Sequence, residues 1–245
     1  MKKLLFLSVG LLVVTAQLYG QQEVKAMSID GGSIPKNFIK INATALLLKN
    51  YSIQYERIMT KRVSLALACR MMPTTNIPFK DKILDNVDSE DENVQSIISN
   101  TNFNNYAITP EVRFYLGKKG YGRGFYIATY YRYANFNMDN IQADFEDDED
   151  ETITTIVASG KATAHTIGFL IGAQWALSKH ICLDWWILGP HAGFGNGNFE
   201  ALPSTAISEN VQQDIREELE DIDIPMTKHT VEVSSNRVAM TFDGP

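Results

Sequence analysis

Beyond its first twenty residues the chain has no long apolar run. No later segment approaches the roughly 18 consecutive apolar residues that a transmembrane helix needs. Apolar residues make up 44% of the chain, which is ordinary for a soluble protein and far too low for a helical membrane protein. A bundle of membrane-spanning helices is therefore excluded.

Cysteine is scarce as well, with only Cys69 and Cys182. The predicted strand order puts the two residues at opposite ends of the molecule. A disulfide needs Cα atoms within about 7 Å of each other, so we expect two free thiols. No cysteine lies near the predicted cleavage site, which argues against a lipoprotein.

Basic charge is also in short supply. The formal net charge is −7, and 23 of the 29 acidic residues lie in three long connections that hold only four Lys or Arg residues. The short connections are basic instead. A nucleic-acid partner is not expected, because its binding face would need a basic footprint. The long connections are 73–104, 136–158 and 196–236, and the short ones are 59–62, 117–124 and 178–180.

The N-terminus has the pattern of a secretory signal. Lys2 and Lys3 precede an apolar segment at 4–14, and Gly20 is suited to cleavage before Gln21. The alternative is an N-terminal membrane anchor. We divide the chain into a signal peptide at 1–20, a leader at 21–36 that is too polar to form a strand, and a barrel domain at 37–245.

Seven segments alternate apolar and polar residues with a period of two, which predicts strands with one apolar face. A soluble sandwich would show the same alternation. Two features favour a membrane: apolar faces of about nine to eleven residues, and polar faces that carry mixed charges. With alternating short and long connections, the pattern predicts an all-β, up-and-down antiparallel transmembrane β-barrel. The segments are 38–48, 51–56, 63–71, 108–116, 125–133, 166–175 and 181–187.

The polar faces of these strands predict a charge network inside the barrel. A narrow eight-stranded barrel fills its interior with side chains and leaves no open pore. Mutual neutralisation is the structural interpretation, and a polar path or a gated small-molecule site is the functional alternative. The expected network consists of Lys40, Glu56, Arg70, Glu111, Arg113, Arg132 and Asp184.

Two features stand out in the long connections. Apolar residues spaced along one face predict an amphipathic helix at 207–222, with Ser208 or Asn210 as its N-cap, that covers the barrel mouth or docks a partner. The acidic run at 146–151 offers carboxylates for Ca²⁺ but lacks the glycine and polar spacers of calcium loops, so a solvated loop is favoured. The segment 229–242 is interpreted as a loop hairpin or as the outer part of a strand pair.

Four stretches together resemble domain-of-unknown-function family 3575, an uncharacterised family of small outer-membrane barrels. The resemblance covers roughly 38–245 and implies an eight-stranded barrel in the OmpA/OmpX size class, with no catalytic or ligand residues assigned. The chain ends without the final strand that the family pattern implies, so we expect the closing strand to be missing. The stretches are KNYSIQYER (49–57), ITPEVRFY (108–115), GFYIA (124–128) and LDWWILGP (183–190).

No residue pattern in the chain predicts catalysis or a cofactor. A lipid deacylase would need a nucleophile beside its base, and His165 on the predicted lipid face has no neighbouring serine. We expect a monomeric, non-enzymatic barrel in the bacterial outer membrane, in contact with lipid and lipopolysaccharide, that serves envelope structure or surface interaction. A ligand-binding or adhesion protein acting through acidic extracellular loops, and a lipid-A or phospholipid modifying enzyme, are the alternatives.

Overall fold

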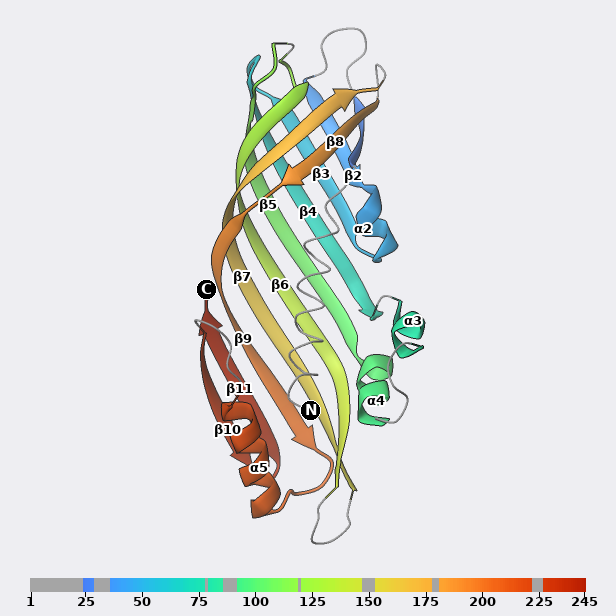
Figure 1. The fold of residues 1–245 in the computed structure, drawn as a ribbon, viewed down its shortest axis with the longest axis vertical. Helices are drawn as coiled ribbons and strands as arrows, with labels where there is room; N and C mark the ends of the chain where they lie inside the picture. The colour runs from blue at the N-terminus through green and yellow to red at the C-terminus, as the bar shows by residue number, and fades with distance from the viewer. Residues whose placement is uncertain are drawn as a thin grey trace.

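The computed structural model describes residues 24–28, 36–77, 79–85, 92–118, 120–146, 153–177, 181–221 and 227–245. Their strands form one antiparallel sheet of eleven strands, which curls into an elongated wall (Figure 1). The fold is all-β, as predicted, with four helices in the described ranges. None of these helices has the length and apolar character needed to cross a membrane. The predicted signal peptide lies outside the described residues.

Eight of the strands are paired in a cycle, which we call the ring. Each strand from β1 to β7 pairs with the next one along the chain, and β8 pairs with both β7 and β1. Each ring strand therefore has a hydrogen-bonded neighbour on either side. The ring strands are β1 (Val24–Ser28), β2 (Asn37–Asn42), β3 (Tyr51–Ile58), β4 (Val63–Asn76), β5 (Asn102–Tyr115), β6 (Gly124–Glu146), β7 (Ile153–Ala176) and β8 (Ile181–Leu188).

Strand β1 corrects the prediction that 21–36 is too polar to supply a strand. Residues 24–28 pair with β2 along one edge, and residues 24–27 pair with β8 along the other. Strand pairing is made by backbone N–H and C=O groups, so a polar segment can satisfy both edges. Strand β1 thus lies between β2 and β8, where we expected a strand to be missing.

The first predicted strand, 38–48, is only partly extended. Strand β2 ends at Asn42, and α2 (Ala43–Leu47) follows. The Asn42 side chain caps this helix by accepting a hydrogen bond from the Ala45 backbone N–H at 3.0 Å. Alanine and leucine, which alternated well enough to suggest a strand, are also strong helix formers. A turn follows this helix, with Lys49 in the left-handed region at φ 55°.

The predicted connection 136–158 is mostly strand. Strand β6 continues to Glu146 and β7 begins at Ile153, and the two pair from Gly124–Gln174 out to Glu146–Ile153. A register shift between Met138 and Ile141 disturbs the alternation within this hairpin. That shift and the many Asn and Asp side chains obscure the period of two, which explains why the sequence alone predicts a loop.

Strand β8 continues as β9 (His191–Pro203) after a break at Gly189–Pro190. Both strands run antiparallel to β7. Strand β8 pairs with residues 171–176 of β7, and β9 pairs with residues 156–168. The other edge of β8 pairs with β1, whereas that of β9 pairs with β11 (Arg237–Gly244). Strand β11 forms a hairpin with β10 (Lys228–Ser234), which agrees with the hairpin predicted at 229–242.

Helices cover the end of the sheet that lies away from the short turns. The predicted helix at 207–222 is present as α5 (Glu209–Glu220), and the Ser208 side chain accepts from the Val211 N–H. An apolar cluster at this end of the sheet includes residues of both α5 and α4 (Glu92–Asn100). Helix α3 (Lys80–Leu84) precedes α4 in the chain. The cluster contains Ile97, Ile141, Ile156, Ala158, Ala201, Ile207, Ile215 and Val238.

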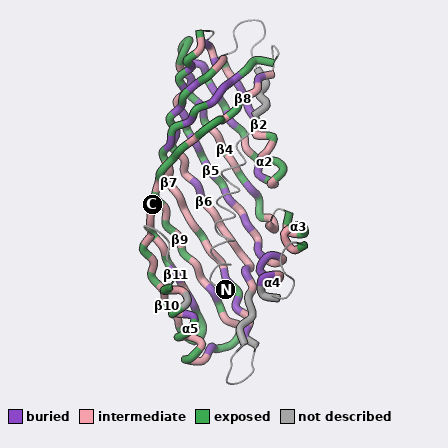
Figure 2. Tube along the Cα trace, viewed as in Figure 1, coloured by how far each residue is buried: buried purple, intermediate pink, exposed green. Residues whose placement is uncertain are grey.

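Burial alternates along the ring strands, because successive side chains point to opposite faces (Figure 2). On β7, for example, Leu170 is buried whereas Ile167 and Phe169 are 66% exposed. The outer face of the ring is strongly apolar, and its inner face carries charged and polar side chains. Exposed apolar residues on the outer face include Ile39, Ile53, Leu65, Leu67, Ile108, Phe114, Phe125, Ile127, Ile167, Phe169 and Ile171.

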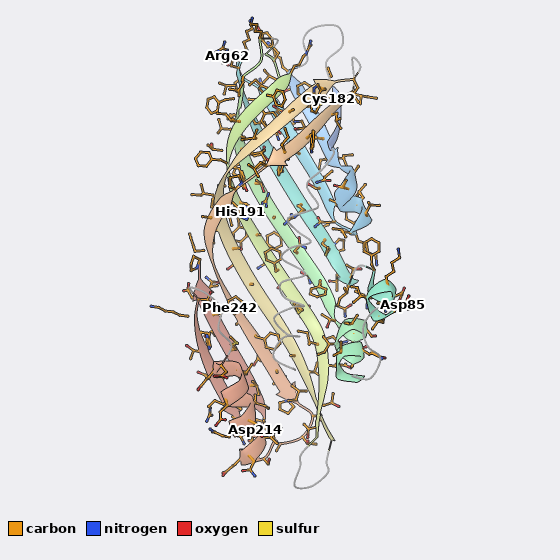
Figure 3. The ribbon with its side chains drawn as sticks, in the orientation of Figure 1. Arg62, Asp85, Cys182, His191, Asp214 and Phe242 are labelled. Atoms are coloured by element: carbon orange, nitrogen blue, oxygen red, sulfur yellow. The ribbon has the colours of Figure 1, made fainter. Side chains whose placement is uncertain are left out.

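The ends of the molecule differ in charge. Arg62, in a short turn, lies at one end, and Asp214, on α5, lies toward the other (Figure 3). The arrangement agrees with the predicted sorting of basic short turns from acidic long connections. Cys69 and Cys182 are both free thiols, as predicted.

Gly172 on β7 offers a test of the inner packing. A Cβ atom there would lie 2.4 Å from Cζ of Tyr126 and 2.9 Å from the Trp185 carbonyl oxygen. We expect Gly172→Ala to lower the free energy of unfolding by about 1–3 kcal/mol, because the Tyr126 ring is fully buried and must shift. Urea titration followed by tryptophan fluorescence measures the effect.

Gly189→Ala is the matched control. Its Cβ atom would meet the Cδ1 end of Leu170 at 3.3 Å and the Phe169 carbonyl oxygen at 3.8 Å, and we expect a change within about 0.5 kcal/mol. Equal costs for the two substitutions would contradict the close approach of Tyr126 to Gly172.

Candidate functional site

Four charged side chains meet inside the ring with no exposed surface. They are Lys40 from β2, Glu56 from β3, Arg113 from β5 and Asp184 from β8, each with 0% relative exposure. Glu111, also on β5, is 2% exposed and joins them. We call these five residues the charge network.

Lys40 lies among three partners. Its Nζ atom is 2.5 Å from Oε2 of Glu56, donates to Oε1 of Gln174 at 2.7 Å, and forms a short ion pair with Asp184. A lysine ammonium has three hydrogens to donate. Gln174 and Asp184 accept hydrogen bonds from it, and the Glu56 carboxylate adds a second counter-charge without accepting a hydrogen bond at Oε2. This pairing offsets the loss of hydration of a buried ammonium.

Arg113 is equally well surrounded. Its Nη1 atom donates to Oδ2 of Asp184 at 2.5 Å, and Nε and Nη2 donate to Oε2 of Glu111 at 2.9 and 2.8 Å. Nη2 also reaches Oε1 of Gln54 at 2.9 Å, and Gln54 Nε2 donates onward to Oε1 of Glu111 at 3.0 Å. The guanidinium lies 4.6 Å from the centre of the Tyr126 ring.

Hydroxyl groups complete the network. Tyr126 donates to Oδ1 of Asp184 at 2.6 Å, and Tyr115 donates to Oε1 of Glu56 at 2.6 Å. Ser64 forms a further short hydrogen bond to Glu56. The network has three carboxylates and only two cations, so it carries an excess negative charge. These hydroxyl groups stabilise that charge by donating hydrogen bonds to the carboxylates.

The network links strands through the interior of the ring. Every strand from β2 to β8 contributes at least one side chain, including Ser64 from β4, Tyr126 from β6 and Gln174 from β7. The strands are thus joined by side-chain contacts as well as by backbone pairing. The charged groups are engaged with one another and fill the interior at this level, so the geometry favours a structural role over proton or group transfer.

Five of the seven predicted network residues come together and two do not. Arg70 and Arg132 face the same interior, but neither forms an ion pair within the described ranges. Five neutral side chains form hydrogen bonds to the charge network, and the sequence alone did not identify them as its partners. They are Gln54, Ser64, Tyr115, Tyr126 and Gln174. A spacing of two from a network charge, as in Gln54–Glu56 and Arg113–Tyr115, is the signal that would have identified two of them.

Comparison with known proteins agrees with the resemblance seen in the sequence. The family model described as "Protein of unknown function (DUF3575)" matches residues 7–214, well over half of the chain. The chain belongs to the DUF3575 family. A search of curated proteins found no match to it.

His165 of this DUF3575 member lies on the outer face, in an aromatic cluster. Its Nδ1 is 2.6 Å from the Tyr131 hydroxyl, and its ring stacks on Phe194 at 5.0 Å between ring centres. Tyr133 packs nearby at 5.2 Å. The neighbouring positions Thr163 and Ile167 offer no serine, and no group of three potential metal ligands occurs in the described ranges.

Asp184→Asn tests the charge network of this DUF3575 chain. We expect it to lower the free energy of unfolding by about 3–5 kcal/mol, because Lys40 and Arg113 would both lose a buried counter-charge. Urea titration measures the change.

Glu200→Gln is the matched control for that substitution. It breaks an ion pair with Arg237 of 2.6 Å between half-exposed side chains, and exposed pairs contribute less than about 1 kcal/mol. A similar cost for Asp184→Asn and Glu200→Gln would show that the interior charges are solvated, and would contradict the network.

Proposed function

We propose that this protein is a monomeric, non-enzymatic outer-membrane β-barrel with a role in envelope structure or surface interaction, exported by a signal at 1–20. The proposal is supported chiefly by one observation, the apolar outer face of the ring around a charged interior. In a water-soluble protein the two faces would be reversed. A membrane-spanning strand turns its apolar face to lipid and its polar face to the lumen.

The aromatic cluster supports the proposal further. Aromatic side chains are enriched where a barrel leaves the hydrocarbon layer. On β7 the apolar Ile167 and Phe169 lie on one side of His165, and Thr163 and Lys161 lie on the other. The outer face beyond the cluster is polar across β7, β9, β10 and β11, where Lys161, Thr163, Asn196, Asn198, Lys228 and Thr230 line a shallow pocket.

The filled interior argues for an envelope or surface role rather than conduction. The charge network occupies the lumen with paired groups, so solutes have no open path at that level. In this proposal the outer face of the ring contacts lipid and lipopolysaccharide. The long connections are available to contact other molecules. In this proposal the acidic end faces the outside and the basic short turns face the periplasm, which is the usual orientation for short turns.

Ile167→Lys tests the proposed lipid contact. We expect it to lower the free energy of unfolding by about 1–2 kcal/mol in phospholipid vesicles, because Ile167 lies just inside the proposed hydrocarbon layer, between the interface, where a cation costs about 0–1 kcal/mol, and the middle of the bilayer, where it costs about 2–4 kcal/mol. Urea titration of the vesicle-inserted protein measures it.

Thr163→Lys is the matched control, on the same strand and face but beyond His165. A cation near the interface costs only about 0–1 kcal/mol. If Ile167→Lys costs no more than Thr163→Lys, the outer face meets water and the membrane proposal fails.

A second candidate function is binding through the acidic connections, favoured by the concentration of 23 of 29 acidic residues there. Replacing the carboxylates of 146–151 by amides should then abolish binding of a cationic partner to whole cells and leave the unfolding midpoint unchanged. Unchanged binding would remove this candidate.

A further inference from the structure

Two arginines on the inner face lie beyond the charge network and are not part of it. Arg70 follows Ala66 and Ala68 on the inner register of β4, and Arg132 follows Tyr130 on that of β6. Both point to the part of the interior that lies toward the far end of the sheet.

These arginines have few partners of their own. In the portion of the chain that the structure describes, Arg70 makes no hydrogen bond or ion pair, and its Nε atom is buried without an acceptor. Arg132 donates only through Nε, to the Thr109 hydroxyl at 3.2 Å, and its guanidinium lies 5.3 Å from the Tyr130 ring centre. Both arginines are partly buried, and charged groups that are removed from water are ordinarily paired.

The strand register brings the two guanidinium groups toward each other. Arg70 is opposite Ala107 on β5, and Ala107 is opposite Ala134 on β6, one inner position from Arg132. Two strand spacings separate β4 from β6 by about 10 Å, a gap that two arginine side chains can reach across. Arg132 is close enough for its positive charge to act on Arg70.

Neither Arg70 nor Arg132 forms an ion pair with an acid in the described ranges. Glu111 acts on Arg132 electrostatically, but its two oxygens already accept from Gln54 and Arg113. Thr166, opposite Arg132 on β7, has a buried hydroxyl with no hydrogen-bond partner. Two arginines without an ion-pair partner and a hydroxyl without a hydrogen-bond partner, all within the described ranges, therefore face one region of the interior.

We propose that Arg70 and Arg132 bind a tetrahedral oxyanion, a phosphate or phosphoryl group, between them, with the Thr166 hydroxyl as a further donor. Arginine presents a planar fork of donors that fits such oxygens, and an anion between the two guanidinium groups removes their repulsion. The group can come from free phosphate or from a phosphorylated headgroup. The proposal requires only the inner face of the sheet, and it does not depend on the envelope role proposed above.

Equilibrium dialysis of the folded full chain in detergent micelles with radiolabelled inorganic phosphate tests the site. We expect one phosphate per chain, and binding about tenfold or more weaker in Arg70→Gln and in Arg132→Gln, because each removes charge-assisted hydrogen bonds. Arg57→Gln, an exposed arginine outside the ring interior, is the matched control and should bind like the wild type.

A stability measurement separates loss of the site from loss of folding. In low-salt buffer without phosphate, Arg70→Gln should unfold at the same or a higher urea concentration than the wild type, because one of two repelling charges is gone. Added phosphate should raise the midpoint of the wild type and not that of the variant.

Two outcomes would overturn the proposal. Equal phosphate binding by the wild type and both lumen variants would mean an adventitious ion only. Absence of binding together with a less stable Arg70→Gln would mean that Arg70 is neutralised within the chain. Competition by glycerol 3-phosphate identifies the source: competition at lower concentration than unlabelled phosphate indicates a phosphorylated headgroup, and weaker competition indicates free phosphate.

Discussion

The buried ion pairs of Lys40 and Arg113 with Glu56 and Asp184 are the constraint on which the ring depends. Charges without water must be paired and hydrogen-bonded, and here strands β2, β3, β5 and β8 each supply one member. The pairs form only when these strands are in the observed register. Moving one strand by a single residue would turn its charge to the apolar outer face, so the network helps to fix the register of the whole ring.

The same constraint explains how the molecule changes along its length. Near the short turns, the strands enclose a core of Phe38, Ile58, Tyr115, Tyr126 and Leu170 next to the charges. Farther along, β2 ends at α2 and β8 passes into β9, so the cycle of pairings gives way to a curved sheet. There the inner face is covered by an apolar cluster that includes α4 and α5. The buried charges thus occur where strands surround them, whereas helices cover an apolar cluster at the far end.

Much of this fold follows from the period of two, because alternation reports which face a side chain occupies. From this alternation the sequence analysis predicted seven strands and placed seven charged residues inside the ring. It could not show which interior charges meet, since that depends on how neighbouring strands are staggered: Asp184 reaches Lys40, whereas Arg70 has no such partner. It also failed where backbone pairing overrides side-chain pattern, as in β1 and the outer parts of β6 and β7, and at α2, where a cap and helix-forming residues end a strand.

Adjacent tryptophans give the most direct test of the proposal that the apolar outer face of the ring contacts lipid and that side chains fill its interior. Trp185 is 39% exposed on the outer face, and Trp186 packs against the inner core. Single-tryptophan variants, with Phe at the other two positions, can be placed in vesicles of lipids with brominated acyl chains. We expect strong quenching of the Trp185 fluorescence and little quenching of the Trp186 fluorescence. Equal quenching of both, or quenching of Trp185 only by a water-soluble agent, would contradict it.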